Sequence, residues 1–73
     1  MTVKRLNEIA IRVNQIRMEC NCNDVSELDE INYVDELIDY SDELIEVSIK
    51  DKYFWLSQSL LHDLQSLASD LLK

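Results

Sequence analysis

The 73 residues of this chain include neither glycine nor proline. Glycine supplies the positive φ angles that tight hairpin turns require, and proline commonly marks turns between strands. The sequence therefore argues against a small β-barrel or β-sandwich. Its content of Leu, Ile, Glu, Asp, Ser and Lys favours an all-helical domain instead. A chain this short forms one domain at most, with a net stability of about 3–5 kcal/mol unless something reinforces its core.

Three segments, over about residues 2–20, 25–47 and 49–72, have the apolar spacing of three and four that is typical of helices. The apolar face of the first segment consists of Val3, Leu6, Ile9, Ala10, Val13, Ile16 and Cys20. That of the second consists of Ile31, Val34, Leu37, Ile38, Ser41, Leu44 and Ile45, flanked by Tyr33, Tyr40 and Val47. The third carries a leucine seam and a neighbouring ridge, made of Tyr53, Leu56, Leu60, Leu64, Leu67 and Leu71, and of Phe54, Leu61, Ala68 and Leu72.

The connections between these segments are predicted to be short. Asn21–Asp24 contains residues that favour turns, and either Asp24 or Ser26 is a suitable N-cap for the second helix. Ser48–Asp51 fits a capping box at the start of the third helix. A straight helix through Ser48 would also rotate the apolar face by more than a quarter turn, so a reversal is favoured over one long helix. We therefore expect a small three-helix bundle, which dimerisation could complete.

Acidic residues are concentrated in the second segment. Ten of the fifteen lie between Asp24 and Glu46, a stretch without Lys or Arg, and the formal net charge is −8. On a helix, most of them gather away from the apolar face, as Asp35, Asp39, Asp42 and Glu46 with Glu36 and Glu43 beside them. Like charges three or four residues apart cost about 0.2–0.5 kcal/mol per pair. Four of the seven cations lie on the first helix and could offset part of this repulsion: Lys4, Arg5, Arg12 and Arg17.

This charge distribution narrows the range of partners. Direct binding to nucleic acid needs a cationic stripe, and an anionic membrane surface would repel the chain. A protein with a basic or apolar groove is the natural complement. No stretch of the sequence is apolar enough to span a bilayer, and the first residues lack the apolar run of a cleavable secretion signal. We therefore expect a cytoplasmic protein, or one exported by a route that leaves no such signal.

The sequence offers little catalytic or metal-binding chemistry. Cys20 and Cys22 form a Cys-x-Cys pair, and His62 is the only histidine, whereas structural zinc sites need four ligands at recognisable spacing. A di-iron bundle would need Glu three residues before His62, where Ser59 stands. His62 and Asp63 are sequence neighbours and so do not face each other on a helix. We predict no enzymatic activity, no metal and no cofactor.

Three apolar residues fall outside the predicted core faces and are candidate contacts for a partner. Ile11 and Met18 lie seven residues apart on the far side of the first helix, either as isolated exposed side chains or as a second contact surface. Trp55 is directed away from the leucine seam, and it either anchors a partner or covers the end of a neighbouring helix.

The leading hypothesis is a small acidic protein-interaction module that sequesters, escorts or inhibits a partner protein. Its predicted contact residues are Asp35, Glu36, Asp39, Asp42, Glu43, Glu46, Ile11, Met18 and Trp55. One alternative is a homo-oligomeric structural bundle, of which a homodimer is the simplest form. Another alternative is an inhibitor that mimics nucleic acid. With a helical rise of about 1.5 Å per residue, the carboxylates of the second helix repeat about every 4.5–6 Å along its axis, and such a row could occupy a protein groove that binds phosphates.

Overall fold

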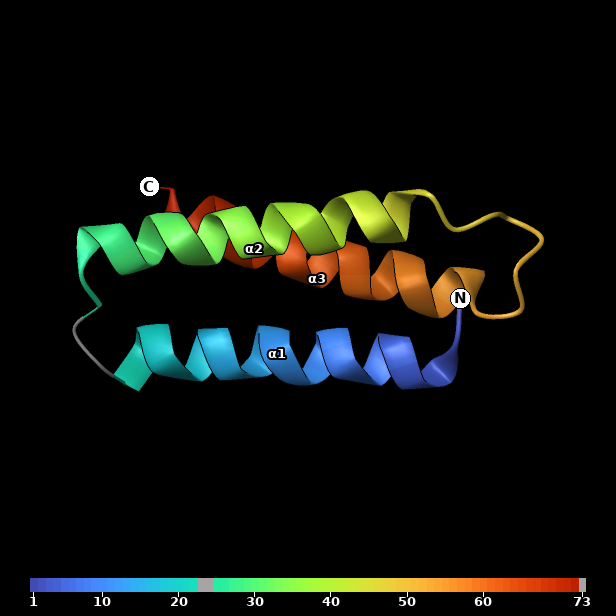
Figure 1. Ribbon diagram of the computed structural model, residues 1–73, viewed down its shortest axis with the longest axis horizontal. Helices are drawn as coiled ribbons and strands as arrows, with labels where there is room; N and C mark the ends of the chain where they lie inside the picture. Colours follow the sequence, from blue (N-terminus) through green and yellow to red (C-terminus); the bar gives the residue numbers. More distant parts are fainter. Residues whose placement is uncertain (23–24, 73) are drawn as a thin grey trace.

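The computed structural model describes residues 1–22 and 25–72, apart from the side chain of Cys22. It contains three helices, α1 (Val3–Cys22), α2 (Glu27–Ile45) and α3 (Phe54–Leu71), which run up, down and up in an elongated bundle of 41 × 18 × 14 Å (Figure 1). No β-strand occurs among the described residues. The predicted all-helical three-helix bundle is therefore confirmed, including the reversal between the second and third helices.

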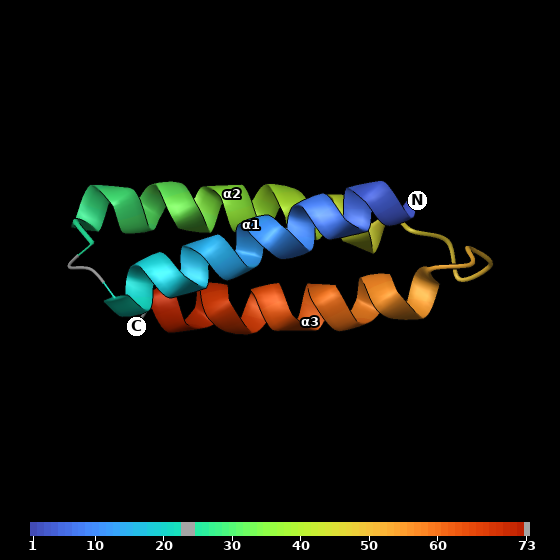
Figure 2. The same ribbon diagram turned by 90° about the horizontal axis from the view of Figure 1, so that it is seen from below.

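The three helices do not contribute equally to the packing. α2 and α3 form the most extensive pair, whereas α1 packs less closely against each of them. α1 lies across one side of the α2–α3 pair and crosses it obliquely, from α2 at its beginning to α3 at its end (Figures 1 and 2). The opposite side of the pair is covered by no helix of the described chain.

The core is formed by the apolar side chains that recur at three- and four-residue spacing. Its buried members are Leu6, Ile9, Val13 and Ile16 of α1, Val34, Leu37 and Leu44 of α2, and Leu61, Leu64 and Leu67 of α3. Two serines are buried among them, Ser41 and Ser57, and the Ser57 hydroxyl donates a 2.6 Å hydrogen bond to the Phe54 carbonyl. All ten of these apolar side chains lie on the faces predicted from the sequence.

Part of each predicted apolar face is nevertheless exposed, which corrects the prediction. The residues concerned are Val3 on α1, Ile31, Ile38 and Ile45 on α2, and Leu56 and Leu72 at the two ends of α3. Each helix of this bundle has only two neighbours, so the arc that it buries is narrower than the arc of apolar side chains that its sequence provides. The bundle therefore leaves apolar strips beside its core.

The start of α2 agrees with the prediction, and the end of α1 does not. Ser26 is the N-cap of α2, and its side chain accepts a 3.2 Å hydrogen bond from the backbone N–H of Asp29. α1 continues through Asn21 to Cys22, into the stretch that was predicted to be a loop. The other candidate cap, Asp24, lies outside the described residues, as does Asn23.

α3 begins at Phe54, five residues later than predicted, because local side-chain hydrogen bonds hold the preceding segment in turns. The Ser48 hydroxyl accepts a hydrogen bond from the N–H of Lys50, and Asp51 Oδ1 accepts one from the N–H of Tyr53. Such bonds to the backbone two residues ahead compete with helix formation. Ser48 and Asp51 therefore shape the connection instead of forming the predicted capping box.

The connection is also tied to the beginning of the chain. The amino group of Met1 donates a 2.7 Å hydrogen bond to Asp51 Oδ2. Together with the N–H of Tyr53, this amino group lowers the pKa of Asp51. The beginning of α1 is thereby held beside the α2–α3 connection (Figure 1).

Candidate protein-interaction surface

Two arginines of α1 join it to α2 through glutamates of the acidic helix. Arg12 donates from Nε to Glu36 Oε2 and from Nη2 to Glu36 Oε1, the latter at 3.0 Å. Arg5 Nε donates to both carboxylate oxygens of Glu43, at 2.9 and 3.0 Å. Paired hydrogen bonds of this kind fix the orientation of the guanidinium as well as attracting it. The expectation that cations of the first helix lie near the acidic helix is confirmed for Arg5 and Arg12.

Tyrosines of α2 complete these contacts. The guanidinium of Arg5 lies 5.7 Å from the ring centre of Tyr40, and that of Arg12 lies 5.9 Å from the ring centre of Tyr33. The Tyr40 hydroxyl also donates a 3.0 Å hydrogen bond to Glu36. The tyrosine flank of α2 therefore faces α1, which explains why the isoleucine flank of the same helix is left exposed.

The pKa shifts on this side of the bundle follow from the same contacts. Hydrogen bonds from Arg12 and Tyr40 lower the pKa of Glu36, against the opposing effect of burial. Burial, followed by the hydrogen bond to Glu36, raises the pKa of Tyr40. A hydrogen bond to the Glu19 carboxylate raises the pKa of Tyr33 to about 12. Glu36 is thus a half-buried partner of α1, and its hydrogen bonds favour the ionised carboxylate.

Replacing Glu36 is expected to cost stability in a pH-dependent way. Glu36→Gln should lower the free energy of unfolding by about 0.5–1 kcal/mol at neutral pH, because the pair with Arg12 is partly exposed and screened. The folded pKa of Glu36 is lowered, so this stabilisation is present above the unfolded value of about 4.3 and is lost as the pH falls through the folded value. Urea unfolding of both proteins at neutral pH and near pH 3 measures the difference.

A neighbouring carboxylate supplies the control for that measurement. Asp35 is exposed and has no salt bridge to a described cation, so Asp35→Asn should not lower stability at either pH. If the loss caused by Glu36→Gln were equally large in acid, the pairing of Glu36 with Arg12 would not be its source.

Four of the six predicted acidic contact residues remain exposed to solvent, three on α2 and one at its C-cap. This acidic row consists of Asp35, Asp39, Asp42 and Glu46, all exposed. None of the four forms a salt bridge with a cation of the described chain, whereas Arg5, Arg12 and Arg17 are paired with other carboxylates. The six predicted acidic contact residues therefore divide into two groups. Glu36 and Glu43 hold α1, and only the acidic row is available to a partner.

An apolar strip runs beside the acidic row. This isoleucine ridge consists of Ile31, Ile38 and Ile45, with exposed fractions of 54%, 48% and 57%. Each member lies seven residues from the next, so the three line up along one side of α2. The ridge was not singled out as a contact surface from the sequence, although the seven-residue repeat of isoleucine beside the acids was visible there.

A shallow groove of about 300 Å³ lies between α2 and α3 next to this ridge. Its lining consists of Leu37, Ile38, Ser41, Leu64, Gln65, Ala68, Ser69 and Leu72. The small side chains of Ser41, Ala68 and Ser69 leave room between the helices, and Ile38 and Leu72 stand at its edges as exposed apolar groups. The groove lies on the side of the pair that α1 does not cover.

The remaining predicted contact residues are exposed, but they lie apart from the acidic row. Ile11 and Met18 are on the outer side of α1, exposed by 59% and 65%. Trp55 is 77% exposed at the beginning of α3, where its ring packs edge-to-face against Phe54 at 5.1 Å. Of the two alternatives for Trp55, this exposure favours a side chain open to solvent over one that covers a neighbouring helix, and its role as an anchor stays a prediction.

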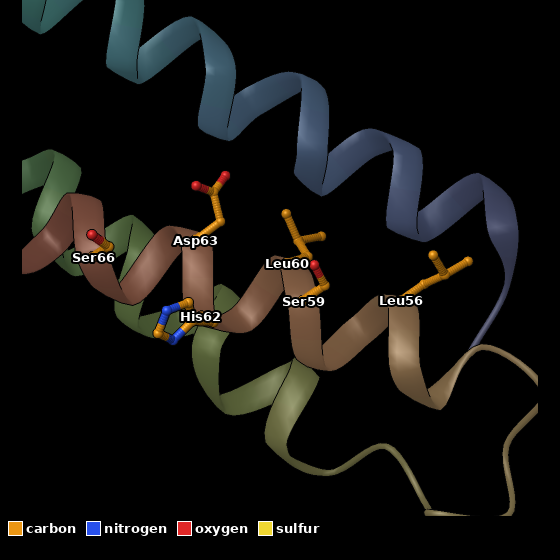
Figure 3. A pocket seen from close by; sticks show the side chains of 6 residues that line it. All are labelled: Leu56, Ser59, Leu60, His62, Asp63 and Ser66. Atoms are coloured by element: carbon orange, nitrogen blue, oxygen red, sulfur yellow. The ribbon is translucent and has the colours of Figure 1, made fainter.

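A second concave strip, of about 510 Å³, lies along α3 alone and includes the only histidine. In Figure 3, the Asp63 side chain points toward α1 and the His62 side chain points to the opposite side. Asp63 instead accepts a 2.8 Å hydrogen bond from Arg17. His62 and Asp63 are therefore not arranged as a hydrogen-bonded catalytic pair.

The described residues form neither a metal-ion cluster nor a membrane-spanning helix. Among the described residues, no three His, Cys, Asp or Glu side chains lie close enough together to hold a metal ion. Burial raises the pKa of the Cys20 thiol, with a further contribution from Glu30 and Glu19. None of the three described helices has both the length and the apolar character needed to cross a membrane.

Comparison with known proteins adds no relative. No protein-family model, no curated protein and no solved structure matches the chain.

Proposed function

We propose that this chain is a small, acidic, non-enzymatic interaction module that acts in the cytoplasm and sequesters, escorts or inhibits a partner protein. The observation that carries the proposal is the position of the acidic row directly beside the isoleucine ridge. Both are exposed along α2 and its C-cap, while three of the four cations of α1 are paired within the chain. Apolar side chains supply affinity in such an interface, and the charges steer association and select partners.

The energetics of folding support this proposal. The acidic row contributes three like-charge pairs at three- and four-residue spacing, 35–39, 39–42 and 42–46, each unfavourable by about 0.2–0.5 kcal/mol. Each isoleucine of the ridge stabilises the fold less than a fully buried isoleucine does, because water still reaches about half of its side chain. A surface that costs stability and exposes apolar groups is typical of a binding site.

Capture of partners by the tagged chain from its native cell tests the proposal. The wild-type chain should enrich a specific partner, and a variant with D35N, D39N, D42N and E46Q should lose it. The control variant E8Q/E19Q removes two exposed charges from α1 and should retain the partner. Equal capture by the wild type and the four-fold variant would exclude the acidic row as the recognition surface, and absence of any specific partner would contradict the function.

A homo-oligomeric bundle is the second candidate, favoured by the seven-residue spacing of Ile31, Ile38 and Ile45. Such spacing is typical of helices that associate through a seam. Sedimentation of the isolated chain separates the two functions. A stable oligomer at micromolar concentration favours the structural role, whereas a monomer that forms a complex with a captured protein favours the interaction module.

A further inference from the structure

We propose that the side of the α2–α3 pair left uncovered by α1 is the docking site for a basic amphipathic helix of a partner protein. This inference rests on the proposed function and assigns the surface and the kind of partner. The site consists of the isoleucine ridge, the groove beside it, Leu72 and the two nearest members of the acidic row, Asp35 and Asp42.

The shape of the site suits a helix. Ile31, Ile38 and Ile45 are spaced by two turns each, about 10.5 Å, so the ridge extends over about 21 Å along α2. The groove between α2 and α3 runs beside the ridge, with small side chains between the two helices. An added helix could place its own apolar stripe between Ile38 and Leu72, as helices do when they dock into apolar grooves. The α2–α3 pair would then carry a helix on both of its sides.

The charge around the site selects the occupant. Asp35 follows Ile31 by four residues, and Asp42 follows Ile38 by four. Each carboxylate therefore lies about one helical turn beyond an isoleucine, on the side of the ridge that is farther from the groove. A helix with Lys or Arg beside its apolar stripe would bring those cations to Asp35 and Asp42. Both carboxylates are exposed and without a salt bridge to a described cation.

The same charges argue against a second copy of this chain. Two copies packed through this side would bring Asp35 and Asp42 of each into the same interface, and each copy has a formal net charge of −8. The arginines that could offset these charges are occupied elsewhere, Arg5 with Glu43, Arg12 with Glu36 and Arg17 with Asp63. Another interhelical groove, between the beginnings of α1 and α3, has no charged residue in its lining and a smaller volume of about 200 Å³.

A designed peptide provides the test. The probe is a helical peptide of about three heptads with Leu at positions a and d and Lys at positions e and g. An otherwise identical peptide with Glu in place of Lys is the control. Titration of each into the isotopically labelled chain, followed by NMR, should shift the amide signals of the isoleucine ridge and of the groove residues of α3. The Lys peptide should bind at least about tenfold more tightly than the Glu peptide.

Matched variants of the chain locate the binding site. I31S/I38S should weaken binding of the Lys peptide by at least about tenfold, because it removes two exposed anchors. I11S/M18S, which removes two exposed apolar residues from α1, should leave binding within about twofold. D35N/D42N should weaken binding and reduce its salt dependence more than E8Q/E19Q does. Circular dichroism of each variant verifies that the bundle is folded.

The contrary outcomes are distinct. Equal binding of the two peptides, signal shifts confined to α1, or a larger effect from I11S/M18S would overturn the proposed site. A homodimer that I31S/I38S dissociates would assign this side to a second copy and overturn the proposed partner. If the cellular partner binds I31S/I38S as well as wild type, the docking site is wrong and the proposed function stands. If no specific partner is captured by either protein, the function itself fails.

Discussion

Leu37→Ala is expected to leave the isolated chain largely unfolded. Leu37 is fully buried at the middle of α2 and belongs to the cluster shared by all three helices. Truncating a buried leucine to alanine costs about 2–5 kcal/mol, from lost burial and from the cavity that remains. A bundle of this size has only about 3–5 kcal/mol of net stability. Urea unfolding followed by circular dichroism measures the loss.

The next residue along the helix supplies a matched control. Ile38 is a similarly large aliphatic side chain, but it is 48% exposed on the isoleucine ridge. Ile38→Ala should cost less than about 1 kcal/mol, because little area is removed from the core and alanine favours the helix. Similar losses from the two variants would contradict the assignment of Leu37 to the buried side of α2 and Ile38 to its open side.

Asp39→Lys is expected to stabilise the chain by about 1–2 kcal/mol at low salt. Asp39 lies at the centre of the acidic row, three or four residues from four other acids, Asp35, Glu36, Asp42 and Glu43. Lysine there would convert four like-charge pairs into opposite-charge pairs. Arg12 and Arg5 already offset the charges of Glu36 and Glu43, so the gain should lie below the simple sum of the pairs. Thermal and urea unfolding of both proteins measure it.

The origin of that gain can be checked with salt and with a neutral variant. Asp39→Asn removes the repulsion without adding attraction and should give about half the effect. In about 1 M salt, where the screening length falls to about 3 Å, both gains should largely disappear. A gain that persists at high salt would show that the like-charge repulsion is not what limits the stability of α2.

The periodicity of the sequence was enough to predict the core. Residues such as Ile9, Leu37 and Leu64 lie at the centre of broad apolar faces, so they are buried in any packing that brings those faces together. The reversal near Ser48 was also predictable, because a continuous helix would have divided the apolar surface between two directions. These features depend on local spacing, which the sequence displays directly.

The partition of α2 into a tyrosine flank and an isoleucine flank was not predictable. Its apolar face is wide enough to receive α1 on either side, and the choice depends on contacts made across the bundle. These contacts join residues that are far apart in the sequence. Arg12 contacts Glu36 and Tyr33, and Arg5 contacts Glu43. The same contacts separate Glu36 and Glu43 from the acidic row, although all six acids belong to one run of sequence.

The late start of α3 reflects a competition that spacing alone does not decide. Ser48 and Asp51 have the residue types of a capping box, but each bonds to the backbone two residues ahead. The amino group of Met1, which is remote in sequence, adds a further contact to Asp51. The sequence pattern therefore indicated the correct break and placed the following helix too early.

The most direct test of the account combines stability and binding in one variant. Asp39→Lys and the wild-type chain are compared for partner capture from the native cell, together with Q15K/S59K, which changes the net charge by the same amount at exposed positions of α1 and α3. We predict that Asp39→Lys is more stable than wild type yet loses the partner, whereas Q15K/S59K retains it. Capture of the partner by Asp39→Lys at the wild-type level would contradict the claim that the acidic row is a recognition surface.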